Sequence, residues 1–223
     1  MTVYVLTERP ERFDKVASIG RQKRPELEFI HCPSIRELLQ FASLFKERDV
    51  LLSYCFHELI PVSVFKFFKT ALNIHVAPPS RPGLDGHFYA AYEGEVTEYG
   101  ATTHIMNAKF DDGEILDVEL VPVDKNASGW DLAAVARACS IKLIERLFEN
   151  GFKKNPIIGN ISWGGKKTKR TDFLSVACRI LPTDSTEEVK RKFHAFQEGV
   201  PFKNLYIDLH GLRFRFEKVI EDG

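Results

Sequence analysis

The amino-acid sequence predicts an α/β fold: a mostly parallel sheet flanked by helices, followed by a small C-terminal α+β appendage. Over the first 75 residues, apolar runs of strand length alternate with segments whose apolar residues recur at helical spacing. Such alternation implies right-handed crossovers between parallel strands. At 223 residues, the chain is long enough to bury the core of one main domain with a small addition.

The predicted elements of the first third of the chain are four strands separated by three helices. The strands are expected at residues 2–6, 26–31, 50–53 and 71–75. Helical spacing of apolar residues marks the segments between them, at 9–19, 34–45 and 62–69. Ser34 stands in the N-cap position of the second helix, and Glu37 follows three residues later, as in a capping box.

The next segment, VAPPSRPGLDG at residues 76–86, is too rich in proline and glycine to form a regular element. It follows a predicted strand end, where ligands bind in open α/β sheets. Two more strands, at 99–106 and 114–121, flank a turn made by Asp111, Asp112 and Gly113. Residues 128–150 form the clearest helix, because their apolar residues mark one face and Ser128 can cap it.

After residue 151 the segments become short and rich in Gly, Asn and Lys, so a boundary is expected near residue 152. This gives an N-terminal domain at 1–152 and a small C-terminal region at 153–223. The C-terminal region is predicted to hold a helix at 187–196 and a hairpin of residues 205–209 and 212–220, closed by His210 and Gly211. From residue 151 onward it carries 14 Lys and Arg against 9 Asp and Glu.

Composition excludes several classes of function. The formal net charge of zero argues against a general nucleic-acid binder. Neither a membrane span nor a secretory signal is expected. The four cysteines are widely spaced and form no C-x-x-C pair, which predicts reduced thiols in a cytoplasmic protein rather than a zinc site or a disulfide framework. No G-x-G-x-x-G follows the first strand, so dinucleotide binding is disfavoured.

Three residues carry the candidate chemistry. Asn73 and His75 are two apart in a predicted strand, so their side chains emerge on one face at the strand's end. An amide can donate to a carbonyl oxygen that becomes negatively charged during acyl transfer to an amine. An imidazole can stabilise the same oxygen or relay protons, and a carboxylate from the Asp111–Asp112 turn can orient it or accept a proton by way of water. Taken singly, each of these features has an ordinary structural explanation.

Together these residues resemble the formyltetrahydrofolate-dependent formyltransferases. The resemblance covers about 45 contiguous residues, from Asn-x-His through a proline-rich loop ending in Gly, an aromatic stretch with Gly-Glu, and Gly-[VA]-T-x-H, to Asp-x-Gly-x-Ile. These motifs lie at residues 73–75, 78–83, 89–95, 100–104 and 111–115. Within the last motif, Asp111 matches the catalytic aspartate and Asp112 fills the variable place. The resemblance implies a Rossmann-like sheet and the catalytic set Asn73, His75 and Asp111.

The resemblance also implies the co-substrate N10-formyltetrahydrofolate and no metal. The folate is expected in a cleft between residues 56–60 and 107–110, with the contacts Phe56, His57, Leu59, Ile60, His104, Lys109 and Phe110. The acceptor is expected against the proline-rich loop and the aromatic stretch, at Pro79, Arg81, Gly83, His87 and Tyr89. Trp163 is expected in a satellite core, with the covering of a ligand as the alternative.

The acceptor is the least defined part of the expected function. The tail, in RTDFLSVACRI and KFHAFQEGVPFKNLYIDLHGLRFRFEKV, resembles the sugar N-formyltransferases, which modify nucleotide-linked amino sugars. Basic side chains expected to meet a diphosphate are Lys166, Lys167, Lys169 and Arg170. The open alternatives are a phosphoribosylglycinamide or methionyl-tRNA formyltransferase and a non-catalytic folate-binding relative. Two departures from the family pattern, Pro-Ser-Arg-Pro-Gly in the loop and Val76 after the histidine, concern the acceptor side. A homodimer through the hairpin edge is a further expectation.

Overall fold

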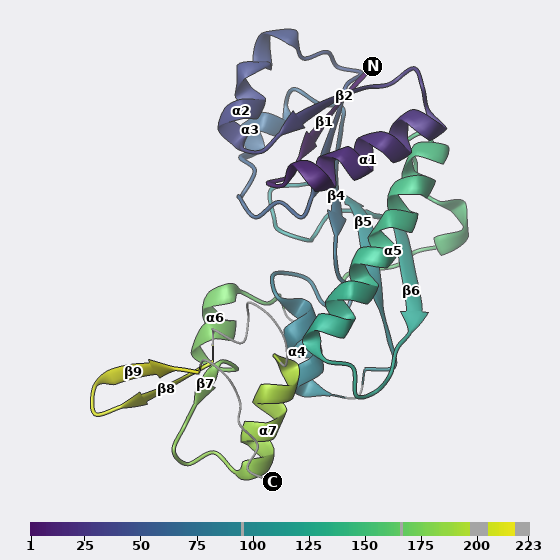
Figure 1. Cartoon of the computed structure of the whole chain (residues 1–223). Helices are drawn as coiled ribbons and strands as arrows, with labels where there is room; N and C mark the ends of the chain where they lie inside the picture. The colour runs from purple at the N-terminus through teal and green to yellow at the C-terminus, as the bar shows by residue number, and fades with distance from the viewer. Residues whose placement is uncertain (95, 166, 197–204, 217–223) are drawn as a thin grey trace.

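The computed structural model has an open sheet with helices on both faces and a smaller sheet in the C-terminal part (Figure 1). It describes residues 1–94, 96–165, 167–196 and 205–216. The main sheet has the order β2-β1-β3-β4-β5-β6. Its strands are β1 (Thr2–Leu6), β2 (Glu28–Cys32), β3 (Val50–Tyr54), β4 (Thr70–His75), β5 (Glu98–Ile105) and β6 (Ile115–Pro122). The first four strands are parallel, and β5 alone runs against its neighbours β4 and β6, which confirms the mostly parallel α/β sheet.

The helices of the main layer are α1 (Pro10–Lys23), α2 (Ile35–Gln40), α3 (Val62–Phe65), α4 (Gly86–Glu93) and α5 (Gly129–Glu149), with a 3-10 turn η1 (Ala42–Leu44) after α2. Ser34 caps α2 by accepting from the Glu37 N–H at 3.2 Å. Ser128 caps α5 in a reciprocal capping box with Asp131. The second and third helices are shorter than expected: α2 ends at Gln40 before η1, and α3 ends at Phe65 before β4 begins at Thr70.

The buried strands bury alternate residues on opposite faces. Val3 and Val5 pack with α1 and α5, whereas Tyr4 and Leu6 pack with Leu38 of α2 and with α3. Both faces of the parallel strands are therefore apolar, as expected for a sheet covered on two sides. The same alternation in β4 puts Leu72 and Ile74 against α5 and leaves the odd-numbered residues on the other face.

The C-terminal part contains η2 (Pro156–Ile158), α6 (Arg170–Ser175), α7 (Thr186–Ala195) and a sheet of β7 (Arg179–Ile180), β8 (Tyr206–Leu209) and β9 (Leu212–Arg215). His210 and Gly211 close the β8–β9 hairpin with φ of 52° and 78°, the positive values that a two-residue hairpin turn requires. The hairpin is confirmed over 206–215, and residues 217–220 of its expected second strand lie outside the described residues.

The C-terminal part packs on the main layer through a shared apolar cluster. Phe88 of α4 and Leu132 of α5 lie in one cluster with Cys178, Phe196 and Tyr206. The division near residue 152 stays a prediction. All four residues of β9 are exposed, so the strand edge expected to support a homodimer is present, and the homodimer also stays a prediction. Within the described residues, the structure has no helix with the length and apolar character that a membrane crossing requires.

Candidate functional site

Strand β4 presents the amide and the imidazole. Asn73 and His75 share one face of the strand, and His75 is its last residue. On the antiparallel side, Asn73 is paired in register with His104 of β5. Because β1, β3 and β4 are parallel, their carboxyl ends meet at this same edge of the sheet, where α/β proteins bind ligands.

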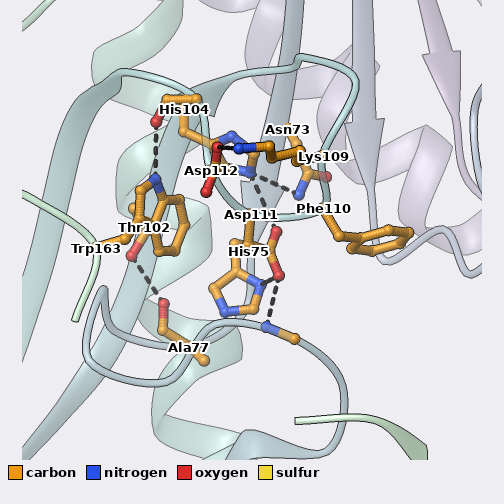
Figure 2. Close-up of polar contacts among 12 residues, drawn as sticks. Asn73, His75, Ala77, Thr102, His104, Lys109, Phe110, Asp111, Asp112 and Trp163 are labelled. Carbon is orange, nitrogen blue, oxygen red and sulfur yellow. Dashed lines mark hydrogen bonds and ion pairs between the residues drawn. The ribbon is translucent and has the colours of Figure 1, made fainter. Parts of the chain in front are cut away.

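Asp111 completes the group from a different segment, the loop between β5 and β6. Its backbone has a φ of 41° and its side chain is buried. One carboxylate oxygen lies 3.4 Å from His75 Nδ1 and the other lies 3.3 Å from His104 Nε2 (Figure 2). The Gly83 N–H donates to Asp111 at 2.7 Å. The structure therefore brings Asn73, His75 and Asp111 together, with His104 as a fourth member.

Asp111 is held in its charged form. Burial by itself would raise the pKa of the carboxyl, but the positive charge of His75, the hydrogen bond and charge of His104, and the Gly83 N–H outweigh burial and lower the pKa to about 2. Asp112 has the opposite environment, since it lies at the surface beside Lys109 and Lys167, and the hydrogen bond from Lys167 is the first cause of its lowered pKa. The neighbouring carboxylates therefore differ in burial and in partners.

The hydrogen bonds assign the ring nitrogens of both histidines. His75 Nε2 donates to the Arg81 carbonyl at 2.9 Å, so Nδ1 is the atom that faces Asp111. His104 Nδ1 donates to the Ile105 carbonyl at 2.9 Å. His104 Nε2 lies 3.3 Å from an Asp111 oxygen and 3.1 Å from the Asn73 amide nitrogen. An amide nitrogen carries two hydrogens, so Asn73 has an N–H available for a carbonyl oxygen in the cleft.

Trp163 packs edge to face against both histidines of the site. Its ring meets His104 edge to face, with centroids 5.0 Å apart, and meets His75 at 5.6 Å. The indole N–H donates to the Gly113 carbonyl at 2.7 Å, which ties the ring to the loop that carries Asp111. Trp163 therefore belongs to the site rather than to a satellite core, although it comes from the C-terminal part of the chain.

The proline-rich loop is shaped by a close approach at Gly83. This residue has a φ of +99°, and a Cβ added there would lie 2.2 Å from the Thr168 carbonyl oxygen. Thr168 also pairs with the loop through the Pro82 carbonyl and the Leu84 N–H. Only glycine fits this position, and the fit holds the Gly83 N–H on Asp111.

Gly83→Ala is expected to lower both stability and kcat. The strained φ alone costs about 1–2 kcal/mol for a residue with a Cβ. The clash with Thr168 must also move the loop, which withdraws a hydrogen bond from Asp111. Thermal unfolding and steady-state rates measure the two effects. Gly94→Ala is the matched control, because Gly94 has a φ of +78° and open space around its Cβ position. An equal loss of kcat in both variants would contradict the role given to the loop.

Two clefts meet at Asn73 and Asp111, which with His75 form the candidate catalytic group. The first lies on the α2/α3 side and is walled by the segments that follow β3 and β5, as expected. Its lining includes six of the seven predicted folate contacts: Phe56, Leu59, Ile60, His104, Lys109 and Phe110. His57 lies in the second cleft instead, where its Nδ1 lies 2.9 Å from Glu8.

The second cleft runs past His75 towards α1 and α5. Of the predicted acceptor contacts, Gly83 and His87 line it. Arg81 and Tyr89 line a separate hollow beside Lys167, and Arg81 is paired with Glu93. Pro79 is buried, and its carbonyl accepts from the Gly164 N–H at 3.0 Å. Four residues line both clefts: Phe56, Asn73, Phe110 and Asp111.

Two of the four basic residues expected to meet a diphosphate are paired with carboxylates. Arg170 lines the second cleft, and it forms two hydrogen bonds with Asp85, at 3.0 and 3.1 Å. Lys167 binds Asp112 and the Phe110 carbonyl. Lys169 is exposed, and Lys166 lies outside the described residues. Sequence reasoning missed two arginines that line the second cleft, Arg12 and Arg137. Within the described residues, no group of three or more His, Cys, Asp or Glu side chains could hold a metal ion.

A family model described as formyl transferase matches residues 37–146. This segment runs from α2 to α5 and includes Asn73, His75 and Asp111. No curated protein matches the chain in sequence.

Among solved structures, the chain is similar to a 4-N formyltransferase from Francisella tularensis, with a TM-score of 0.77 and 19% identity over 99% of this chain and 98% of that one. A sugar N-formyltransferase from a Shewanella species gives a TM-score of 0.75 and 16% identity over 100% and 99%. An N-formyltransferase from Helicobacter canadensis, in complex with folinic acid and dTDP-3-aminofucose, gives 0.63 and 15% over 87% and 80%. At these identities the likeness shows the fold.

Proposed function

The chain is a formyltransferase by its match over residues 37–146, and on that premise we propose that it moves a formyl group from N10-formyltetrahydrofolate to the amine of a nucleotide-linked amino sugar. The observation that carries the proposal is the meeting of two clefts at Asn73 and Asp111. A donor in one cleft and an acceptor in the other would place the formyl carbon and the amine on either side of the catalytic group.

The first cleft suits a flat aromatic donor. Its walls are largely apolar, with Phe56, Leu59, Ile60, Phe65, Met106 and Phe110 among them. Ser53, Asn107 and Asn73 supply polar atoms in the same lining, which suits a ring with hydrogen-bonding edges. The Helicobacter neighbour was solved with a folate, folinic acid, which supports the same class of donor here.

Each residue of the catalytic group has a proposed role. N10-formyltetrahydrofolate supplies a formyl group on a nitrogen that can leave. Asn73 donates an amide N–H to the formyl oxygen as negative charge develops there. His75 stabilises that charge and relays the proton that the attacking amine loses. A carboxylate with a pKa of about 2 is a weak base, so Asp111 acts mainly by orienting His75 and stabilising its protonated ring.

Features of the acceptor side favour a nucleotide-linked sugar over the alternatives. A phosphate cradle at the start of α1 would use backbone N–H groups, but the first helical residue is Pro10 and the turn before it contains Glu8. The tail carries a modest basic excess, which gives little support for tRNA binding. The fold likeness covers the Francisella and Shewanella enzymes almost end to end, so the C-terminal part resembles theirs as well.

A panel of acceptors tests the function. The protein is given N10-formyltetrahydrofolate with dTDP-, UDP- and GDP-linked amino sugars, glycinamide ribonucleotide or methionyl-tRNA, and formylated products are measured by mass spectrometry. We expect kcat/KM for one nucleotide-linked amino sugar to exceed that for the other two acceptor classes by at least about 10²-fold. Preferential formylation of glycinamide ribonucleotide or methionyl-tRNA would replace the proposed acceptor. Folate binding without turnover of any of these acceptors would favour a non-catalytic relative.

A further inference from the structure

The second cleft lies at the point where the sheet changes winding direction. Strands β1 and β3 are neighbours in the sheet, but the chain leaves β1 towards β2 and leaves β3 towards β4. The connections lie on opposite faces, because α1 packs against α5 and Val64 of α3 packs in the cluster on the other side. The carboxyl ends of two such strands leave a crevice between them, which is where open α/β sheets bind ligands.

Three arginines line this crevice, and Arg12 and Arg137 are the two that are not paired with a carboxylate, since Arg170 is paired with Asp85. Arg12 lies in the first turn of α1, just after β1, and its Nη1 donates to the Cys55 carbonyl at 3.1 Å. Cys55 follows β3 with a φ of 49°, so Arg12 links the two strand ends. Arg137 lies on α5, where it is exposed and stands 5.9 Å from the Trp130 ring.

Neither arginine forms an ion pair with a carboxylate within the described part of the chain. The nearby carboxylates have other partners, since Glu8 pairs with His57 and Asp85 pairs with Arg170. The positive charges of Arg12 and Arg137 act on the same part of the crevice, around the Cys55 thiol. Burial raises the pKa of the Cys55 thiol, and both arginines oppose that rise. Burial, together with the charges of Arg137, His75 and Arg170, lowers the pKa of His87 to about 4 against the effect of Asp85.

Arg12 and Arg137 give the crevice a positive end next to the catalytic group, and the two carboxylates of its lining, Asp85 and Asp111, are paired with Arg170 and with the histidines. Guanidinium groups bind phosphate oxygens through paired N–H donors and retain their charge in a cleft. The amides at the start of α1 are poorly suited to the same task, because Pro10 lacks an N–H. An anionic group held by side chains rather than by a helix terminus therefore fits this crevice.

We propose that Arg12 and Arg137 form the anion subsite of the acceptor cleft and hold the diphosphate of the acceptor while its amine reaches Asn73 and His75. The assignment of the anion to the acceptor rests on the proposed function. Affinity for a diphosphate at these two residues does not depend on it, because it follows from their position and their charge.

Binding measurements on arginine variants test the subsite. Titration calorimetry compares dTDP, UDP, GDP and inorganic pyrophosphate on the wild type, Arg12→Ala and Arg137→Ala. We expect each variant to bind the best of these ligands on the order of 10- to 100-fold more weakly, as for the loss of one charge-assisted contact. The acceptor KM should rise while kcat changes less, since the diphosphate is remote from the reacting atoms. Folate affinity should stay unchanged, because neither arginine lines the first cleft.

Two further variants separate the subsite from structural effects. Arg21→Ala removes a guanidinium from the far end of α1, where it lies 5.7 Å from the Phe29 ring, and should bind diphosphates like the wild type. Arg12→Ala also removes the hydrogen bond to the Cys55 carbonyl. Within the described residues the Arg137 side chain makes no hydrogen bond that Arg137→Ala would remove. A loss in Arg137→Ala therefore reports on anion binding without that loop contact.

The two proposals can fail separately. If an amino-sugar nucleotide is formylated with unchanged KM by both arginine variants, the subsite is wrong and the proposed function stands. If no amino-sugar nucleotide is formylated but pyrophosphate binding weakens in both variants, the subsite stands and the proposed acceptor is wrong. Wild-type affinity for pyrophosphate and all three nucleotides in both variants would overturn the subsite.

Discussion

Asp111→Asn is expected to lower kcat by about 10²- to 10⁴-fold, the usual contribution of a proton-transfer group, because His75 depends on Asp111 for its orientation and charge. The substitution keeps the size of the side chain and an oxygen that can accept from Gly83, so the loop should keep its shape. It removes the negative charge that lies 3.4 Å from His75 and 3.3 Å from His104. The His75 ring then loses the group that stabilises its protonated form during proton transfer.

The neighbouring carboxylate provides the control. Asp112→Asn makes the same chemical change one residue away, at an exposed side chain paired with Lys109 and Lys167. Its kcat should stay within a few-fold of the wild type, because it contacts neither histidine within the described residues. Steady-state rates with saturating donor, together with circular dichroism and thermal unfolding, make the comparison. Equal rates in the two variants would show that Asp111 is not part of the catalytic group.

The local parts of the site could be predicted from the sequence. A spacing of two in a strand puts Asn73 and His75 on one face wherever the strand lies. The strand-end position of the loop at 76–86 also followed from the sequence, because proline and glycine end a regular element. The match of Asp111 rather than Asp112 to the motif agrees with the structure, where Asp111 is buried against the histidines and Asp112 is exposed.

The parts that the sequence did not disclose depend on distant segments. Trp163 reaches the histidines because Gly164 and Thr168 pair with the proline-rich loop, a contact that no local sequence pattern predicts. In the sequence, Arg12 is an ordinary polar residue of an amphipathic helix. Only the pairing of β1 with β3 places it beside the end of β3 and the second cleft. Likewise, Lys167 and Arg170 looked available for a ligand in the sequence, and only the fold reveals their pairing with Asp112 and Asp85.

Asn73→Ala is expected to lower kcat by about 10²- to 10³-fold, as for the loss of one donor to a developing oxyanion. Asn73 lines both clefts, and its amide nitrogen lies 3.1 Å from His104 Nε2. Removing the side chain therefore takes away both the donor to the formyl oxygen and the partner that helps fix the His104 ring. Affinity for 5-formyltetrahydrofolate, measured by calorimetry, should fall far less than kcat, because the donor cleft keeps its apolar walls.

A second variant distinguishes a lost donor from a cavity. Asn73→Asp fills the same volume as the wild type but replaces the N–H groups by an acceptor oxygen, and it puts a second negative charge beside Asp111. If Asn73 acts as the donor, the Asp variant should be at least as slow as the Ala variant, since its charge repels the developing oxyanion. If the loss in Asn73→Ala came only from a packing defect, the Asp variant would recover activity. Recovery would remove Asn73 from the catalytic group and leave oxyanion stabilisation to His75.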